Sequence, residues 1–325
     1  MRLRPIKRIP MDRASAEQAE PAWSWDSYEA EHGAVSLEAR RLESLPVVHG
    51  NARRASGGTL SRFVGGSHHA QREEAALSVD HPALRERRSM FPKSVTPAET
   101  SPRLLVSGHN SSKLGAIVRR GPWRGMPIYH LTLEERATCP DSCQLWRECF
   151  GNAMPFTRRH AHGEALEDRL ASELFVLSKA HPAGFVVRLH GLGDFYSAEY
   201  ALGWRWALDL LPALRVFGYT AHEAASPIGE IITASNAAHP DRCCIRFSVA
   251  ADAPPAPHQV STVWHQARGR QGDSVVCPQQ SGDTAACATC GLCWHQNARH
   301  LRILFIGHGM RRRGTRATNE GGTNG

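Results

Sequence analysis

Seven of the nine cysteines in this chain of 325 residues fall into two short segments, and this clustering restricts the fold more than any other feature. The first segment, CPDSCQLWREC, contributes three thiols, and the second, CPQQSGDTAACATCGLC, contributes four. The two sets are Cys139, Cys143 and Cys149, followed by Cys277, Cys287, Cys290 and Cys293. Thiolates at such short spacing are typical metal ligands. The sequence therefore predicts a metalloprotein with two separate sites.

A disulfide framework is the competing interpretation, and it would require a secreted chain. The first residues, MRLRPIKRIPMDRAS, are basic and lack the continuous apolar run of a signal peptide. The sequence also lacks a run of about 18 apolar residues that could cross a membrane. We therefore expect reduced thiols in a cytoplasmic protein. The net charge of +8 permits an anionic partner such as nucleic acid, although basic proteins without such a partner are common.

Composition changes near residue 100. Residues 1–100 are rich in Arg, Glu, Ala, Ser, Gly and Pro and contain few aromatic side chains, so they have too little apolar surface for a core of their own. We expect a mostly disordered extension with some helix. Residues 309–325 form a basic, Gly-rich tail that we expect to be disordered as well. The metal-binding core is expected over residues 101–308, with the four-cysteine module at 277–293.

Strand-like and helix-like segments alternate between these ends. Short β-branched or aromatic runs predict buried strands at 184–190, 214–219, 245–249, 274–277 and 302–306, with a weaker candidate at 127–131. Leucine and aromatic residues recur at helical spacing in 164–179 and 197–211, where Ser197 is placed as an N-cap. Alternation of this kind predicts an α/β fold with a parallel sheet. About 200 residues favour an open parallel sheet or a partial (β/α) barrel over a closed eight-stranded barrel.

The three-cysteine segment leaves three interpretations open. Three thiolates in a loop rich in Pro, Asp and Ser can hold three irons of a 4Fe–4S cluster and leave the fourth iron open, which is what we expect here. A closed zinc site would need a fourth ligand, which His160 or His162 could supply by folding back. The thiols could also be buried without any ligand.

The four-cysteine segment supplies a complete ligand shell, with Gly291 relieving its tight turn. Zinc and a second iron–sulfur cluster both fit four thiolates, and the spacing does not choose between them. The open cluster expected earlier in the chain favours iron, whereas a structural zinc knuckle that pins the last strand to the sheet is the alternative. Cys243 and Cys244 are different, because adjacent residues of a strand point to opposite faces, and we expect both in the core.

The segment VVRLHGLGDFYS is a second candidate site. A strand that runs into Gly191, Gly193 and Asp194 places a carboxylate and free backbone groups at the carboxyl end of a parallel sheet, where ligands bind in such folds. Asp194 could equally be a turn former or a helix-capping acid. Arg188 and His190 alternate with apolar residues, so both are expected on one face, either in a polar pocket or as a satisfied core pair.

Other polar residues extend these two segments. His222 follows the next predicted strand, at the equivalent end of the sheet, and a similar argument applies to Arg246. Arg158 and Arg159 come shortly after the three cysteines and could pair with a carboxylate or phosphate of a cofactor or of nucleic acid. A solvated loop is the alternative for these two cations.

Several of these motifs together resemble a known family. ATCPDSCQLWRECFGNAMPFTRRH, VVRLHGLGDFYSAEYALGWRW, LRVFGYTAH, IRFS, VCPQQ and CATCGLCW follow one another as in the uncharacterised phage family called gene product 88. The resemblance covers roughly residues 103–308. Members occur in phages, prophages and other mobile elements, so the resemblance implies a biological context and not a chemical activity.

The chain also resembles, more distantly, the radical S-adenosylmethionine (SAM) enzymes. These use a partial α/β barrel with a three-cysteine loop after the first strand and a Gly-Gly-Glu-like segment after the second. The resemblance implies that the three-cysteine set holds a 4Fe–4S cluster, that Gly191, Gly193 and Asp194 meet the amino group of SAM, and that the later four cysteines form an auxiliary-cluster module. The chain departs from the pattern in its longer second cysteine spacing, in Phe150 following the last cysteine, and in Asp replacing Glu.

We therefore expect an iron–sulfur enzyme of radical SAM type with an unidentified substrate. Arg188, His190 and His222 are the candidates for catalysis. The phage context and basic charge associate the substrate with nucleotides or nucleic acid. The alternative is a zinc-stabilised nucleic-acid-binding protein without catalytic activity.

Overall fold

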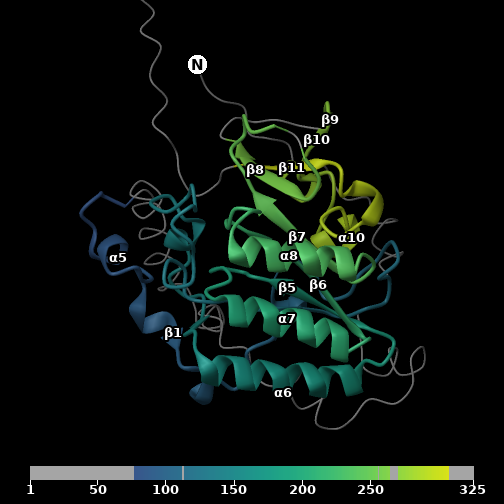
Figure 1. Ribbon diagram of the computed structural model, residues 1–325, viewed down its shortest axis with the longest axis horizontal. Coiled ribbons are helices and arrows are strands. Elements are labelled where there is room, and N and C mark those ends of the chain that lie inside the picture. Colours follow the sequence, from purple (N-terminus) through teal and green to yellow (C-terminus); the bar gives the residue numbers. More distant parts are fainter. Residues whose placement is uncertain (1–76, 112, 255, 264–269, 307–325) are drawn as a thin grey trace, which may run out of the picture.

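The computed structural model describes residues 77–306 except for 112, 255 and 264–269 (Figure 1). The described residues form a mixed α/β fold around one nine-stranded sheet, in the order β2-β3-β5-β6-β7-β8-β11-β10-β9. All neighbours from β3 to β10 are parallel, while β2 and β9 are antiparallel at the two edges. The predicted α/β class is therefore confirmed, as is an open sheet that is parallel except at its two edges.

The strands of this sheet are β2 (Val106–Ser107), β3 (Ile128–His130), β5 (Phe185–Leu189), β6 (Leu214–Thr220), β7 (Cys243–Ser248), β8 (Gln259–Val263), β9 (Arg270–Gln271), β10 (Ser274–Val276) and β11 (Arg302–Ile306). A separate pair is formed by β1 (Val95–Thr96) and β4 (Arg159–His160). The α-helices are α5 (Pro82–Arg85), α6 (Glu164–Ala180), α7 (Ala198–Leu210), α8 (Pro227–Ala238), α9 (Pro278–Ser281) and α10 (Cys287–Cys290). Short 3-10 turns are η2 (Pro92–Ser94), η3 (Ala98–Thr100), η4 (Gly108–Asn110), η5 (Phe150–Ala153) and η6 (Gln296–Ala298).

The three long helices lie side by side on one face of the sheet (Figure 1). Each connects two parallel strands, and right-handed crossovers between strands that follow one another in the same direction place all their helices on the same face. In α7 the apolar stripe of Tyr200, Trp204 and Leu208 is buried against the sheet. Its start is fixed by Ser197, whose side chain accepts a hydrogen bond from the backbone N–H of Tyr200, as the sequence predicts.

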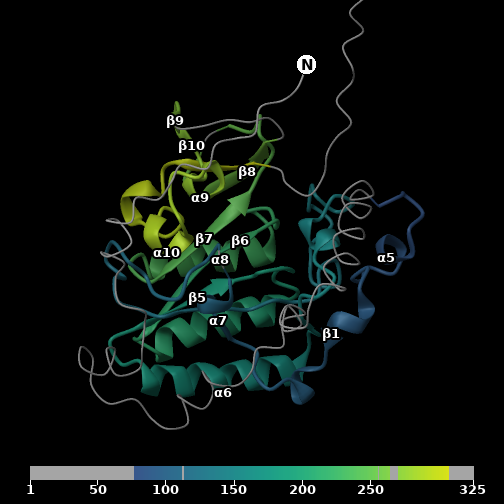
Figure 2. The same cartoon turned by 180° about the vertical axis from the view of Figure 1, so that it is seen from behind.

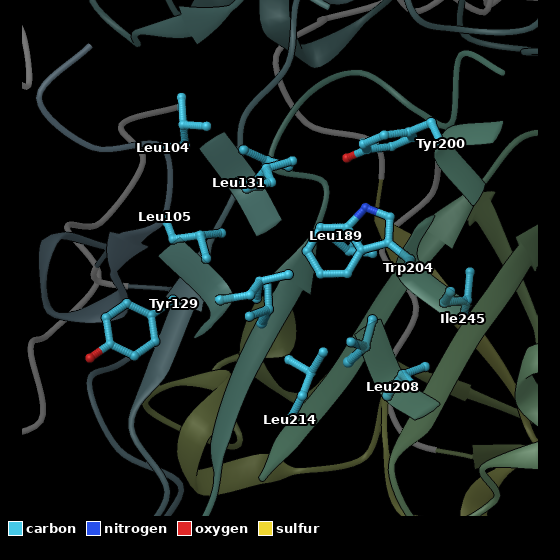
Figure 3. Packing of buried hydrophobic residues seen from close by; sticks show 14 of the residues in the cluster. Leu104, Leu105, Tyr129, Leu131, Leu189, Tyr200, Trp204, Leu208, Leu214 and Ile245 are labelled. Carbon is cyan, nitrogen blue, oxygen red and sulfur yellow. The ribbon is translucent and has the colours of Figure 1, made fainter. Parts of the chain in front are cut away.

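Alternation along the strands divides the core into two layers. On the helix-covered face, Val187, Leu189 and Cys243 join the main hydrophobic cluster, part of which Figure 3 shows. On the opposite face, Val186 and Cys244 join a second cluster. The prediction that Cys243 and Cys244 are core residues on opposite faces is therefore confirmed, and the same period of two decides which strand residues face which layer.

The second face is covered by the four-cysteine module and by the loop between β2 and β3. Trp123 of the loop stacks on Trp294 of the module, with ring centroids 5.6 Å apart. Arg246 of β7 is fully buried and donates hydrogen bonds to the carbonyl groups of Cys293, Ala298 and Leu301. Figure 2 views this side, with α9 and α10 in front of the sheet. Arg246 thus anchors the module and does not line a polar pocket.

The predicted disordered extension is wrong for residues 77–100. Leu77 is buried and its backbone N–H donates to the carbonyl of Arg147, while the Ser89 hydroxyl donates to Glu135. The composition of the whole segment concealed these contacts, because a few buried residues suffice when the core is supplied by the rest of the chain. The remainder of the predicted extension, 1–76, and the tail 309–325 lie outside the described residues. Within the described residues, no helix is long and apolar enough to span a membrane.

Candidate metal centres

The three-cysteine loop lies at the carboxyl ends of β3, β5 and β6. After β3, the backbone N–H of Leu133 donates to the carbonyl of Leu192, so the chain leaving β3 runs beside the chain leaving β5. Within the loop, the Ser142 hydroxyl donates to the carbonyl of Ala221, just beyond β6. These contacts place the loop at the sheet edge where parallel α/β folds bind ligands.

The three thiols lie within electrostatic reach of one another. Burial raises the pKa of the Cys139 thiol, and the neighbouring charges of Asp194 and Cys149 raise it further. For Cys149, burial and the Glu135 carboxylate raise the pKa to about 11, although Arg136 acts in the opposite direction. Such thiols stay protonated at neutral pH unless a cation binds them, because a metal ion deprotonates the thiol that it binds.

A buried charge network, which the sequence analysis did not identify, supports this loop. Arg136 donates hydrogen bonds to the carbonyl of Trp146 and to the side chain of Asn152, which lie on either side of Cys149. Its third nitrogen, Nη1, has no hydrogen-bond partner among the described residues and lies 3.9 Å from Oε1 of Glu135. Both Arg136 and Glu135 are almost fully buried. Their only sequence signal is position, since Glu135 and Arg136 stand four and three residues before the first cysteine of the set.

Arg159 belongs to the same network. Its guanidinium pairs with Glu135 and also donates to the carbonyls of Gly151, Met154 and Thr157. With those bonds made, Arg159 has no donor left for a cofactor or for nucleic acid, and the carboxylate partner expected for it is internal. Arg158, its neighbour, is half-buried and makes no hydrogen bond among the described residues.

Asp194 lies near two of the three thiols, since its charge interacts with those of Cys139 and Cys143. One carboxylate oxygen accepts a hydrogen bond from the backbone N–H of Phe195 and the other from that of Ala221. Burial raises the pKa of Asp194, while the hydrogen bond from Ala221 lowers it. The residue therefore joins the ends of β5 and β6. A carboxylate has about four lone-pair positions, so it keeps acceptor capacity for a ligand.

The two glycines before Asp194 allow close packing of backbone. A Cβ on Gly191 would lie 2.6 Å from the Thr132 hydroxyl, and one on Gly193 would lie 2.5 Å from that of Thr138. Gly193 also has a positive φ of 79°, which disfavours other residues. The Gly-x-Gly-Asp turn is thus held directly against the chain that leads into the three cysteines.

The expected catalytic residues are not gathered in one place. His190 and Arg188 were expected on one face, and this is wrong because β5 ends at Leu189, so strand alternation stops before His190. The His190 ring contacts Tyr200 of α7 on the helix side, with Nε2 3.0 Å from the hydroxyl. Arg188 lies over the Tyr219 ring on the opposite face. His222 is near the three-cysteine loop, where its Nε2 donates to the carbonyl of Phe195.

The four later cysteines surround one small cavity on the second face. They line it together with Trp294 and Ile303. Cys277 follows β10, and α10 begins and ends at Cys287 and Cys290, after which Gly291 takes a left-handed conformation with a φ of 69°. The expected role of Gly291 in the tight turn is confirmed. The charges of Cys277, Cys287 and Cys293 interact with one another.

Neither set forms a compact site for a single ion. Within the part of the chain that the structure describes, no three His, Cys, Asp or Glu side chains are close enough to hold one metal ion together. None of the cysteines forms a disulfide among the described residues. The structure therefore brings each set of cysteines together without fixing what they bind.

A family model described as Gene product 88 matches residues 104–296, which is more than half of the chain. The protein belongs to the gene product 88 family. The match contains both cysteine sets and the turn that ends at Asp194, so the family resemblance seen in the motifs is confirmed. No curated protein and no solved structure matches the chain. The resemblance to radical SAM enzymes receives no support from these comparisons and stays a prediction.

Proposed function

We propose that this member of the gene product 88 family is an iron–sulfur enzyme of radical SAM type. The observation that carries the proposal is the meeting of Cys139, Cys143 and Cys149 with Asp194 at the carboxyl ends of β3, β5 and β6. A partial barrel of that family would have its three-cysteine loop after one strand and its amino-group contact after the next. The order of β3 and β5 in the chain and in the sheet agrees with that arrangement.

The donor set of the first site fits a cluster better than zinc. A closed zinc site needs a fourth ligand. Of the two histidines considered for it, His162 packs on the ring of Tyr196, with centroids 5.1 Å apart. His160 is buried where Arg158 and Arg169 lower its pKa, and the thiols are not among the charges that act on it. Three thiolates without a fourth ligand suit a 4Fe–4S cluster with one open iron.

The residues around this site can be assigned roles. The three thiolates would each hold one iron, and Asp194 would accept a hydrogen bond from the amino group of SAM. The free Nη1 of Arg136 is available to donate to a cluster sulfide, and the pair of Glu135 and Arg159 fixes the loop. A cluster reduced by an external one-electron donor would supply the electron that cleaves SAM into methionine and a 5′-deoxyadenosyl radical, and this radical would take a hydrogen atom from the substrate to become 5′-deoxyadenosine. The charge of +8 and the phage context favour a nucleotide or nucleic-acid substrate.

The four-cysteine set would hold a second iron–sulfur cluster. In a tetrahedral zinc site with bonds of about 2.3 Å, the sulfur atoms lie about 3.8 Å apart. In a cluster each thiolate binds a different iron, so the sulfurs stand farther apart. Four cysteines that line one cavity can supply the four thiolates that such a cluster needs. A structural zinc ion is the alternative, and it belongs to a second candidate function, a nucleic-acid-binding protein, which the positive net charge favours.

Metal analysis and SAM titration test the proposal together. Protein purified without oxygen should contain iron and acid-labile sulfide, and calorimetry should detect SAM binding. Asp194→Asn should weaken that binding about tenfold, since losing a charge-assisted hydrogen bond costs roughly 1.5 to 3 kcal/mol. Asp209→Asn, which changes a carboxylate at the far end of α7 beside His239, is the matched control. Colourless protein with stoichiometric zinc, or no SAM binding by the unmutated protein, would overturn the proposal and leave the zinc-binding alternative.

A further inference from the structure

Two cations and a hydroxyl group interact with the four-cysteine set. Tyr219 of β6 donates a hydrogen bond from its hydroxyl to the sulfur of Cys293, at 2.9 Å. Lys113, in the loop after β2, interacts electrostatically with Cys277, Cys287 and Cys293. Its backbone carbonyl also accepts a hydrogen bond from the N–H of Cys287, which ties the loop to the module.

Arg188 completes this group. It comes from β5, and its charge interacts with both Cys287 and Lys113. The cations rest on aromatic rings, with Lys113 5.8 Å from the centroid of Phe305 and Arg188 5.7 Å from that of Tyr219. The two rings meet edge to face at 5.2 Å. The arrangement is therefore one continuous unit of two cations on two rings.

No carboxylate balances this unit. Among the described residues, neither Lys113 nor Arg188 forms an ion pair, although both are partly buried and repel each other. Bringing two like charges together away from water is unfavourable unless an anion lies nearby. Among the described residues, Cys287 is the acidic group whose charge interacts with both cations, and Lys113 also interacts with Cys277 and Cys293.

Charge arithmetic shows what would satisfy the two cations. Four thiolates carry four negative charges, and a 4Fe–4S core in its usual oxidised state carries two positive charges, so the bound centre has a charge of about −2. Lys113 and Arg188 together supply +2. Four neutral thiols would leave both cations uncompensated, so the surroundings suit a charged centre and not an empty pocket.

We propose that Lys113, Arg188 and Tyr219 are positioning residues that raise the reduction potential of the four-cysteine cluster and make it an electron-transfer centre. This inference rests on the second cluster of the proposed function. On reduction, the cluster takes one electron from a one-electron donor, its charge falls from −2 to −3, and no bond or proton is transferred. Nearby cations and a hydrogen bond to a ligating sulfur stabilise the extra negative charge. A purely structural site has no need for such an environment.

The test isolates the second cluster in the full-length chain. Cys139→Ala, Cys143→Ala and Cys149→Ala are combined, so that only the four-cysteine centre remains. Iron, sulfide and zinc are counted, and the centre is then titrated with dithionite while its paramagnetic resonance and absorbance are recorded. Lys113→Met and Arg188→Met should each make reduction about tenfold less favourable, which corresponds to a potential about 59 mV lower for a one-electron couple. Tyr219→Phe should act in the same direction by several-fold.

Matched variants separate tuning from simple loss of structure. Lys113→Arg and Arg188→Lys keep the charges and should restore the potential. Arg215→Met neutralises a cation on the same strand as Tyr219 whose charge interacts with Arg242 and Asp241, and it should leave the potential unchanged. If the triple cysteine variant does not fold, the same titration is made with all cysteines present, where SAM perturbs only the first cluster.

Two results would overturn the inference. One is zinc in place of iron at the second centre. The other is an equilibrium constant for reduction that stays within twofold of the parent value in both Lys113→Met and Arg188→Met. Failure of the proposed function is seen separately, because SAM binding is measured at the first site and does not depend on Lys113, Arg188 or Tyr219.

Discussion

The two cysteine sets differ in their electrostatic surroundings. The three-cysteine set lies at the edge of the sheet, where burial raises the pKa values of its thiols and two buried carboxylates, Asp194 and Glu135, raise them further. The four-cysteine set is enclosed on a face of the sheet, where burial raises the pKa of Cys287 although the charges of Arg188 and Lys113 act in the opposite direction. Acidic neighbours suit a site that binds a further cationic group, such as the amino group of SAM. Cationic neighbours suit a closed anionic centre. Cysteine thiols in acidic and in cationic surroundings therefore suit two different kinds of site.

The largest expected effect separates the two sets by mutation. Cys143→Ala should abolish SAM-dependent spectral changes and leave the second site's metal bound. Cys290→Ala should instead lower folding stability by several kcal/mol, because a closed metal site contributes its binding free energy to folding. Metal content and thermal unfolding measure both. Equal loss of all metal in the two variants would show that the sets form one shared site.

Removing residues 77–100 should lower the free energy of unfolding, because this segment packs on the three-cysteine loop. Residues 77–100 contact the three-cysteine loop through Leu77 and Ser89, so a chain that begins at residue 101 loses these contacts. We expect its free energy of unfolding to fall by on the order of 5 kcal/mol relative to a chain that begins at residue 77, since burying one leucine alone contributes about 2 kcal/mol. Chemical denaturation checks this. Equal stability of the two chains would mean that the segment's packing contributes nothing.

The buried charge network beside the three-cysteine set gives a further way to separate the two sets. Glu135→Ala leaves Arg159 buried without its carboxylate, and breaking a buried pair in this way costs about 3 to 5 kcal/mol. Iron should be lost from the three-cysteine set before the other. Glu86→Ala, which removes an exposed carboxylate paired with Arg88, is the control and should change neither stability nor metal content. A similar loss of iron from both sets in Glu135→Ala would contradict a local role.

The smallest expected effect concerns pH. Burial lowers the pKa of His190 to about 3, whereas the unfolded chain binds a proton there near pH 6.5. The stability that His190 provides is present above pH 6.5 and is lost as the pH falls toward 3, with about 2 kcal/mol lost at pH 5. Denaturation at pH 8 and pH 5 measures it. His190→Gln should remove this part of the pH dependence, and an unchanged slope would show that His190 does not titrate as its burial requires.

The local pattern of apolar residues was sufficient to predict many of the strands and helices. Apolar runs predicted β5, β6, β7, β10 and β11 to within a few residues, and helical spacing predicted α6 and α7. The helix α8 was missed, although Ser226 followed by Pro227 is a readable start signal, because its sequence is rich in small and polar residues. The short strand β8 was missed as well.

The sequence by itself determined the two thiol sets, the order of most strands and helices apart from α8 and β8, and the family. Each of these depends on residues that are neighbours in the chain, where spacing alone fixes which side chains share a loop or a face. Only the tertiary structure decided that Arg188 and His190 lie on opposite faces, that Lys113 and Tyr219 adjoin the four cysteines, and that residues 77–100 pack on the core. These contacts join segments far apart in the chain. Burial and the interactions between charges depend on such contacts, so the spacing of residues within one segment does not encode them.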